Sequence, residues 1–430
     1  MKDYRLVLGL EVHFHVKTAT KMFCACGADI YGAEPNTHTC PTCLGLPGAL
    51  PVPNQDAIRK VQLFGLALGG TVNKESRFDR KHYFYPDLPK GYQISQYKHP
   101  LCSGGSVTLD SGKIVEIERV HMEEDTAKSF HEKGMTLIDF NKSGMPLGEL
   151  VTKPVFTSIE DAVEFSKRLQ QILRSTGVGD ADMEKGQMRL EANISIRTPE
   201  MPDTELPNYK VEIKNINSFR FLENAVNAEV TRQIEILKSG GKVIQENRGY
   251  DEATKSTVSQ RIKEEAHDYR YFPEPDIPSM VFDDTYIEEL RKRLPELPEQ
   301  KADRFCKDYG LTSAISRRLV SSEALCMFEE LMGKGQDAVL TANNLLNKPE
   351  YLAMSVDEYM KVQDQAKDKI SGTGDLMPVI ERVLAANPSV IDDYRKGKTS
   401  SIEFLVGMVM RETKGKADAG VVRDLISKNL

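Results

Sequence analysis

Two pairs of closely spaced cysteines give the sharpest chemical signal in the sequence. Cys24 and Cys26 form the first pair, and thirteen residues separate them from Cys40 and Cys43. Four thiolates at these spacings can close a tetrahedral zinc site, in which each Zn–S distance is about 2.3 Å. Because four sulfur ligands leave no open position on the metal, we expect a structural zinc site in the loop 24–43.

Two alternatives to this site remain open. The four cysteines could be unrelated buried thiols, or His38 could replace one of them as a ligand. The remaining cysteines are scattered through the chain and are expected to be core thiols; they are Cys102, Cys306 and Cys326.

A second signal is a set of carboxylates, accompanied by a histidine, on segments that alternate like β-strands. Glu11 and His13 share one face of such a segment, because strand side chains repeat every two residues. Glu149 has the apolar neighbours Leu147 and Val151 on its own face, and burying a carboxylate is costly unless it is paired or binds a metal. Converging acids of this kind could hold Mg²⁺ and, through it, the phosphates of a nucleotide. The alternative is that they pair with arginine and lysine; the other members of the set are Glu123, Glu124, Asp125, Glu184 and Glu191.

A third signal comes from two segments, 78–93 and 267–276, that are dense in aromatic, basic and proline residues. Interleaved rings and cations suit unpaired nucleotides, because bases stack on the rings and the cations neutralise phosphates. The alternative is that both segments are rigid loops whose rings pack on the core.

The segment 211–219 runs from a predicted strand into a predicted helix. Asn217 or Ser218 could cap that helix, and the helix N-terminus could also hold an anion. The sequence contains no GxxxxGK[ST], GxGxxG or GxSxG motif. A nucleotide site would therefore have to be built on the polar face of a sheet.

The elements that must position these residues are strands with one apolar face. Residues 6–17, 188–197 and 211–214 alternate between apolar and polar side chains. This pattern is typical of an antiparallel sheet with one buried and one accessible face.

Two amphipathic helices are predicted to cover the apolar face of this sheet. The first spans 157–177, and Thr157 with Glu160 fits a capping box at its start. The second runs from Phe221 to a pair of glycines at 240–241. The sequence thus predicts an α+β fold in its N-terminal part.

Beyond about residue 290 the helical period takes over almost completely. Prolines between 273 and 298 interrupt regular structure, and the segment 371–374 is short and flexible enough to be a linker. We expect an N-terminal antiparallel-sheet domain with flanking helices (1–290), followed by all-helical C-terminal domains (291–370 and 371–430).

Composition restricts the class of protein. The 430 residues include 57 Lys+Arg and 64 Asp+Glu, a net charge of −7, which excludes a globally basic nucleic-acid coat. With 40% hydrophobic and 28% charged residues the chain is that of a globular protein, and no run approaches the roughly 18 apolar residues that cross a bilayer. The first residues lack the apolar core of a signal peptide, and seven cysteines are an odd number. We expect a protein of the reducing cytoplasm with no membrane association.

Taken together, the motifs resemble those of the B subunit (GatB) of the tRNA-dependent aspartyl/glutamyl amidotransferases. The resemblance runs from near residue 4 to the C-terminus and is densest before residue 280. The matching stretches are Gly9–His13, Pro35–Thr37, Cys40–Gly48, Tyr83–Gln93, Glu123–Asp125, Asp139–Asn141, Pro146–Leu147, Glu149, Lys214–Ser218 and Asp268–Asp276.

The resemblance implies an ATP-dependent carbon–nitrogen ligase with glutamine as amido donor. In that family, the B subunit uses ATP and Mg²⁺ to phosphorylate the side-chain carboxylate of Glu or Asp carried by tRNA(Gln) or tRNA(Asn). Ammonia, which the amidase (the A subunit) releases from glutamine, then displaces the phosphate. A small third protein, the C subunit, bridges the other two.

The resemblance also implies roles for particular residues. It implies a catalytic set of Glu11, His13, Glu124, Glu149 and Glu191, of which His13, Glu124 and Glu149 would bind magnesium. The residues that it implies as contacts to ATP are Lys214, Asn215, Asn217 and Arg261. The residues that it implies as contacts to the tRNA are Tyr83, Tyr85, Lys90, Tyr92, Arg270, Lys414 and Lys416.

The chain departs from the family pattern at several positions. Glu191 stands where an Asp is expected, Gly148 stands where a branched apolar residue is usual, and the helical half is shorter by several tens of residues. The rival hypothesis is a non-catalytic, zinc-stabilised scaffold that binds tRNA. The survival of the carboxylate set favours the enzyme, and the absence of a glycine- and serine-rich nucleophile segment means that glutamine hydrolysis must come from a partner.

Overall fold

The computed structural model describes residues 4–429, apart from 263–268, 368–372, 396–400 and 414–415. Contacts divide the chain into two compact units, residues 1–301 and 302–430. Each unit is built around its own hydrophobic clusters.

The N-terminal unit is organised by one large sheet with the strand order β15-β14-β13-β12-β1-β11-β8-β6-β2 and with β7 also paired to β8. Neighbouring strands run antiparallel, with the exception of β13 and β14, which are parallel. The long central strands supply the register on which the site depends. The strands are β1 (Arg5–His15), β2 (Thr71–Val72), β6 (Cys102–Ser103), β7 (Ser106–Thr108), β8 (Ile114–Glu124), β11 (Pro146–Thr152), β12 (Met188–Arg197), β13 (Val211–Ile216), β14 (Glu246–Asp251) and β15 (Ser256–Ile262).

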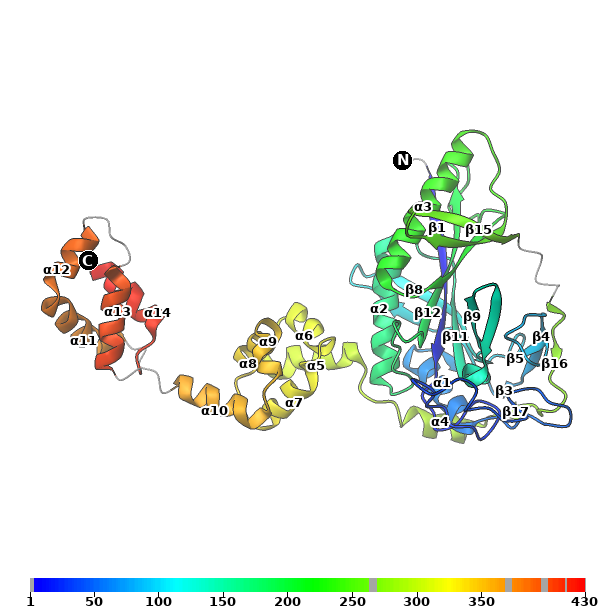
Figure 1. Cartoon of the computed structure of the whole chain (residues 1–430), viewed down its shortest axis with the longest axis horizontal. Helices are drawn as coiled ribbons and strands as arrows, with labels where there is room; N and C mark the ends of the chain where they lie inside the picture. The colour runs from blue at the N-terminus through cyan, green and yellow to red at the C-terminus, as the bar shows by residue number, and fades with distance from the viewer. Residues whose placement is uncertain (1–3, 263–268, 368–372, 396–400, 414–415, 430) are drawn as a thin grey trace. The chain divides into compact units, whose positions relative to one another are not determined.

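Helices cover one face of this sheet, and smaller sheets lie on the other side (Figure 1). The alternation of β1 buries Leu8, Leu10, Val12 and Phe14 beneath the helices. Helix α3 packs on β12 and β13, and α1 packs on β8. The helices are α1 (Gln55–Ala67), α2 (Ile159–Ser175), α3 (Phe219–Lys238) and α4 (Asp284–Arg291).

Side-chain caps fix where the two predicted helices begin. Ser158, and not Thr157, caps α2: its hydroxyl accepts a hydrogen bond from the backbone N–H of Asp161. The predicted capping box is therefore wrong by one residue, because Ser158 is the residue with the extended backbone that a cap requires. Ser218 caps α3 by accepting from the N–H of Phe221, as one of the two expected alternatives.

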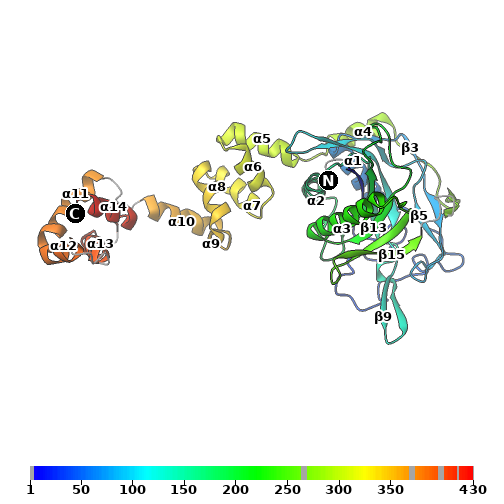
Figure 2. The same ribbon diagram turned by 90° about the horizontal axis from the view of Figure 1, so that it is seen from above.

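Short strands and one hairpin complete the polar side of the N-terminal unit. Figure 2 shows the hairpin of β9 (Lys128–Glu132) projecting from this unit. The hairpin ends in a 3-10 turn, η1 (Phe140–Lys142). The remaining elements are β10 (Met135–Asp139), the sheet of β16 (Phe272–Pro273), β4 (Asp79–His82) and β5 (Tyr92–Ser95), and the pair of β17 (Met280–Val281) and β3 (Glu75–Ser76).

The regular elements that the structure describes in the C-terminal unit are helices, as expected. One hydrophobic cluster is centred on Phe305, Phe328 and Tyr359, and a separate one on Ile380 and Leu405. The helices are α5 (Pro298–Tyr309), α6 (Ser313–Val320), α7 (Leu325–Gly333), α8 (Ala338–Asn347), α9 (Pro349–Leu352), α10 (Val356–Lys367), α11 (Thr373–Ala386), α12 (Pro388–Arg395), α13 (Ser401–Glu412) and α14 (Ala419–Asn429).

The expected α+β class is confirmed, with a mixed rather than purely antiparallel sheet. The three-domain division at 290 and 370 stays a prediction, and the two separate helical clusters are the observation that supports its second boundary. Among the described helices, none combines the length and the apolar composition needed to cross a bilayer.

Gly148 illustrates how the packing explains a departure from the family pattern. It lies opposite Phe14 in the β1–β11 pairing, and a Cβ placed on it would stand 2.3 Å from Cζ of Phe14. The ring of Phe14 is fully buried against Phe64, at a centroid distance of 4.9 Å. The aromatic ring therefore occupies the space that a branched side chain would fill.

We predict that Gly148→Val lowers the free energy of unfolding by about 1–3 kcal/mol, because a well-packed core does not accept added methyl groups. Phe14→Leu in the same chain should recover part of the loss, which a double-mutant cycle by denaturant unfolding measures. Gly9→Ala is the matched control, since its Cβ would meet Pro154 at an ordinary 3.5 Å. Equal stability of Gly148→Val and wild type would contradict this account.

Candidate active site and metal centre

A row of three side chains crosses the polar face of the sheet at its centre. Strand pairing places Glu149 of β11 opposite His13 of β1 on one side and opposite His121 of β8 on the other. Both imidazoles approach the same carboxylate oxygen: the Nε2–Oε2 distance is 3.3 Å for His13 and 3.4 Å for His121. The buried carboxylate of Glu149 is thereby held between two imidazoles.

Glu123 completes this cluster, because it follows His121 by two residues on β8 and therefore faces the same way. Its carboxylate lies 3.5 Å from Nε2 of His121 and 3.9 Å from Nε2 of His13. The ligand atoms of His13, Glu123 and Glu149 all lie within 4.8 Å of one another. Carboxylates are donors that suit Mg²⁺, whereas imidazole is a less usual ligand for this ion. The residues fit a magnesium ion held mainly by Glu123 and Glu149.

The expected magnesium ligand Glu124 is turned the other way. Alternation along β8 places it on the face of the buried Met122. Its carboxylate pairs with the ammonium of Lys90 and accepts a hydrogen bond of 2.9 Å from the backbone N–H of Ile94. The structure thus gathers Glu123 rather than Glu124 into the cluster. The apolar Met122 beside these two acids was the sequence signal that could have distinguished them.

The charges in this cluster reinforce one another. Burial would lower the pKa of His13, but the charge and hydrogen bond of Glu149 raise it to about 9. Burial also opposes ionisation of Glu149, yet His121 and His13 hold the pKa of its carboxyl well below the usual range. Burial would raise the pKa of Glu123, but the ammonium of Lys81, 3.9 Å away, lowers it overall. Both carboxylates are therefore ionised and available to a cation.

The cluster lines a cavity of about 250 Å³ on the polar face of the sheet. Several predicted residues share it: Glu11, His13, Tyr83, Glu149, Glu191 and Lys214. Glu123 and Asp125 of the expected carboxylate set also line the cavity, as do Lys81, Gln93 and Tyr269 of the two aromatic segments. Other residues of the lining carried no signal in the sequence, because they become neighbours only through strand pairing and loop packing; they are Thr126, Leu147, Arg189 and Glu212.

Glu191 and Lys214 form the wall of the cavity toward β13. Nζ of Lys214 lies 2.9 Å from the carboxylate of Glu191 and also pairs with Glu212. Burial raises the pKa of Glu191, and Lys214 opposes that effect. Asn215 and Asn217 are exposed and do not line this cavity.

A second charged group stands at the end of β8. Asp125 accepts a 2.7 Å hydrogen bond from Nε2 of His15 and pairs with Arg189 at 3.2 Å and Lys142 at 3.1 Å. Burial opposes the charge of Asp125, but Arg189 and Lys142 hold the pKa of its carboxyl well below the usual range. This network fixes Arg189, and with it β12, against the end of β8.

The two aromatic segments meet through the sheet of β16, β4 and β5. Tyr83 and Tyr269 contact edge to face with ring centroids 6.2 Å apart, and the Lys81 ammonium lies 5.2 Å from the centre of the Tyr269 ring. Arg80 stacks on Tyr92 at 4.3 Å. Tyr83, Lys81 and Tyr269 therefore give the cavity a wall of rings with a half-buried cation.

The other residues expected to contact tRNA are distributed more widely. Tyr85, Arg270 and Lys416 are exposed, Tyr92 lies beneath Arg80, and Lys90 pairs with Glu124. Arg261 lies on β15 opposite Asn247. Lys414 lies outside the described residues.

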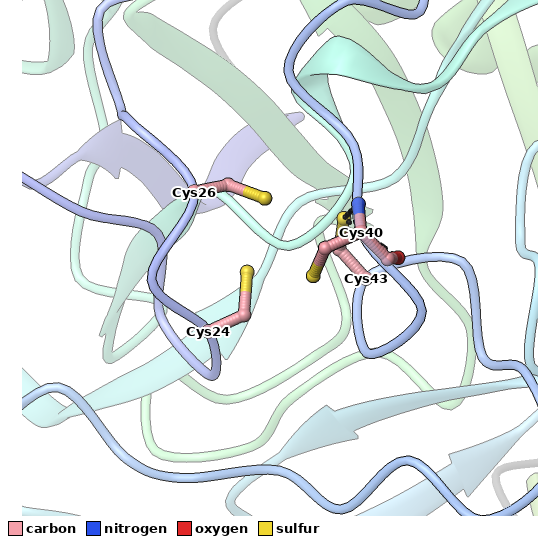
Figure 3. A group of neighbouring side chains, drawn as sticks. All are labelled: Cys24, Cys26, Cys40 and Cys43. Atoms are coloured by element: carbon pink, nitrogen blue, oxygen red, sulfur yellow. Dashed lines mark hydrogen bonds between the residues drawn. The ribbon is translucent and has the colours of Figure 1, made fainter.

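The four predicted zinc ligands come together from two loops (Figure 3). The sulfur atoms of Cys24, Cys26, Cys40 and Cys43 all lie within 4.8 Å of one another. Sulfurs of a tetrahedral zinc site are about 3.8 Å apart when each Zn–S bond is about 2.3 Å. The cluster therefore fits zinc. His38 is not part of it, and its Nδ1 lies 3.1 Å from the hydroxyl of Thr37.

Hydrogen bonds already favour a thiolate in this cluster. A hydrogen bond from Cys24 lowers the pKa of Cys43 to about 4. The backbone N–H of Cys40 also donates to Sγ of Cys43, at 3.1 Å. Burial raises the pKa of Cys26 to about 11. Metal binding would release protons from the remaining thiols, which is the general behaviour of thiolate sites.

The three other cysteines differ from one another. Cys102 is a buried core thiol as expected, whereas Cys306 is half-buried and Cys326 is exposed. The expectation of a core thiol is thus wrong for Cys326, because it lies on the outer side of α7, whose inner side carries Phe328 and Leu331.

We predict about one zinc ion per chain in the purified protein, as four thiolates require. Cys40→Ser should lower the zinc content, measured by elemental analysis, to well below one per chain. Cys326→Ser is the control, since this exposed cysteine is remote in sequence from the cluster. Wild-type protein without zinc, or Cys40→Ser with an undiminished content, would argue against the site.

Comparison with known proteins places the chain in a family. Residues 6–288 match the GatB/GatE catalytic domain, and residues 355–430 match the GatB domain. The chain is 41% identical to the aspartyl/glutamyl-tRNA(Asn/Gln) amidotransferase B subunit of Thermotoga maritima, over 99% of both chains. It is 39% identical to the protein of the same name from Caldicellulosiruptor saccharolyticus, over 100% of this chain and 99% of the relative.

The alignment with the Caldicellulosiruptor protein extends over 481 positions, whereas the chain has 430 residues. The alignment therefore contains gaps in this chain, as a shortened chain requires, and the location of the shortening in the helical half stays a prediction. The chain belongs to the family of aspartyl/glutamyl-tRNA(Asn/Gln) amidotransferase B subunits.

Proposed function

We propose that this chain phosphorylates the side-chain carboxylate of Glu or Asp attached to tRNA(Gln) or tRNA(Asn), with ATP as the phosphoryl donor. A carboxylate is a poor acyl donor, because its oxygen is a poor leaving group. Transfer of the γ-phosphoryl group makes an acyl phosphate and ADP. Attack by ammonia on the acyl carbon then forms the amide and releases phosphate.

The observation that carries this proposal is the group of ionised carboxylates, Glu123 and Glu149, buried beside His13 and His121 in a cavity. These carboxylates would hold Mg²⁺, and His13 would join them as a ligand in its neutral form, after release of its proton to solvent. A metal ion in this place offsets negative charge on the phosphates. Glu11 lines the same cavity and is fixed by a 2.8 Å hydrogen bond from the side-chain amide of Asn193.

Cations on two walls of the cavity would bind the phosphates of ATP. Lys81 approaches from β4, and Arg189 and Lys214 approach from β12 and β13. Each is already paired with a carboxylate, so that its position is set before a ligand arrives. Positioning and charge neutralisation are the main contributions a protein makes to phosphoryl transfer.

The aromatic wall would receive a base or the terminal nucleotide of the tRNA. Tyr83 and Tyr269 line the cavity, and rings of this kind stack on bases regardless of sequence. The exposed Tyr85, Arg270 and Lys416 would contact the tRNA outside the cavity. We also propose contacts to ATP for Asn215, Asn217 and Arg261, and a contact to the tRNA for Lys414.

We propose that an amidase (the A subunit) and a small bridging protein (the C subunit) complete the complex. This chain contains no nucleophile segment for glutamine hydrolysis, so the ammonia must come from such a partner. The substrate is an aminoacyl-tRNA, and the proposed location is therefore the cytoplasm. The names of the relatives likewise describe one subunit, designated B, of an amidotransferase.

The test is release of ADP by the complex with its A and C subunits, with and without Glu-tRNA(Gln) or Asp-tRNA(Asn). We predict that Glu149→Gln and Glu123→Gln reduce the aminoacyl-tRNA-stimulated rate about 100-fold or more, because each removes a charge that the metal requires. Binding of the tRNA, measured by filter retention, should change less than about twofold, since neither residue is a phosphate-binding cation. Glu132→Gln, on the exposed hairpin, is the control.

Glu124→Gln provides a second comparison within the same pair of acids. Because Glu124 faces Lys90 and not the cluster, we predict that it retains more ADP release than Glu123→Gln. The reverse order would return the metal-binding role to Glu124. Wild-type complex that binds tRNA but shows no stimulated ADP release would leave the non-catalytic scaffold as the function.

A further inference from the structure

Lys21 is a fully buried lysine beside the cysteine cluster, and the phosphoryl-transfer proposal gives it no role. Its Nζ donates hydrogen bonds to the backbone carbonyl oxygens of His38, at 2.7 Å, and Ser143, at 2.8 Å. The same Nζ lies 3.7 Å from Sγ of Cys43. A third carbonyl oxygen, that of Phe140, lies at 3.4 Å.

A buried ammonium is costly unless an opposite charge lies close to it. Within the part of the chain that the structure describes, no carboxylate pairs with Lys21. The group beside it that can carry a negative charge is the sulfur of Cys43, 3.7 Å from Nζ, as a thiolate. Four thiolates around Zn²⁺ carry a net charge of −2, which itself has to be offset in a buried setting. The positive charge of Lys21 and the net negative charge of the metal–thiolate group would therefore offset each other.

The hydrogen bonds of Lys21 also join two segments that are distant in sequence. His38 belongs to the loop that carries Cys40 and Cys43, whereas Ser143 belongs to the turn before β11. The hydroxyl of Ser143 donates to the carbonyl oxygen of Cys43 at 3.1 Å. The backbone N–H of Met22, next to Lys21, donates to the carbonyl oxygen of Gly144 at 2.8 Å. Lys21 therefore lies at the junction between the zinc loop and the strand that carries the central carboxylate.

We propose that Lys21 is a positioning residue of the zinc site: its ammonium balances the charge of the thiolates and holds the loop of Cys43 against the turn that leads into β11. The inference rests on the zinc site and not on the phosphoryl-transfer chemistry. Residues that surround metal ligands in this way affect metal affinity about 10–100-fold.

The experiment measures the rate at which zinc passes from the purified amidotransferase complex to a chromophoric chelator. We predict that Lys21→Met releases zinc at least about tenfold faster than wild type, as expected for loss of a group that supports a ligand. Lys21→Arg keeps the charge and should release zinc at a rate closer to wild type. Lys17→Met is the matched control, because Lys17 is exposed and pairs with Asp180.

If Lys21→Met does not fold, Lys21→Gln tests the proposal in its place. Glutamine retains a hydrogen-bond donor but lacks the charge of lysine. Its melting temperature is measured with zinc bound and after chelation. A larger loss of Tm in the zinc-bound protein supports the proposal, because the thiolate charge is then left unbalanced. An equal loss in both states, or zinc release as slow as wild type, overturns it and leaves Lys21 a structural residue only.

Discussion

The carboxylate of Glu149 is buried between two imidazoles, and this arrangement depends on the register of three strands. β11 pairs with β1 on one side and with β8 on the other, so that Glu149 has His13 and His121 as its direct neighbours. A shift of one residue in either pairing would turn the histidine of that strand to the apolar face, and a shift in both would leave the carboxylate unpaired. The free energy of an unpaired buried charge is thus a constraint on how the sheet can form.

The same alternation gives the sheet two functions. One face packs against helices through Leu8, Leu10, Val12 and Phe14, and the other carries the acids, histidines and cations of the cavity. Because a strand offers each face every second residue, one set of strands can build the core and the chemical site together. Packing of the apolar face therefore also fixes the positions of the site residues, because both faces belong to the same strands.

The cysteine cluster holds the surroundings of this sheet in place. Gly45, which follows the last cysteine by two residues, has a φ of +67° and packs so closely on Lys90 that a Cβ would stand 2.5 Å from its Cγ. Lys90 in turn pairs with Glu124 at the end of β8. The loop of the cysteine cluster thereby contacts Lys90, which pairs with Glu124, on one side, and through Lys21 it contacts the turn before β11 on the other. A metal bound by the four cysteines would tie these contacts together.

Patterns within single segments were enough to predict the local features of this protein. Alternation predicted the strands and their polar faces, spacing predicted the four cysteines of the cluster, and ordered motifs identified the family. The sequence also contained the distinction between Glu123 and Glu124, in the apolar Met122 before them. Only the folded chain shows which distant residues meet: His121 beside Glu149, Lys81 beside Glu123, and Asp125 beside Arg189. The physical reason is that strand register and loop packing are set by non-local pairing and burial, whereas a sequence pattern reports only what each segment favours on its own.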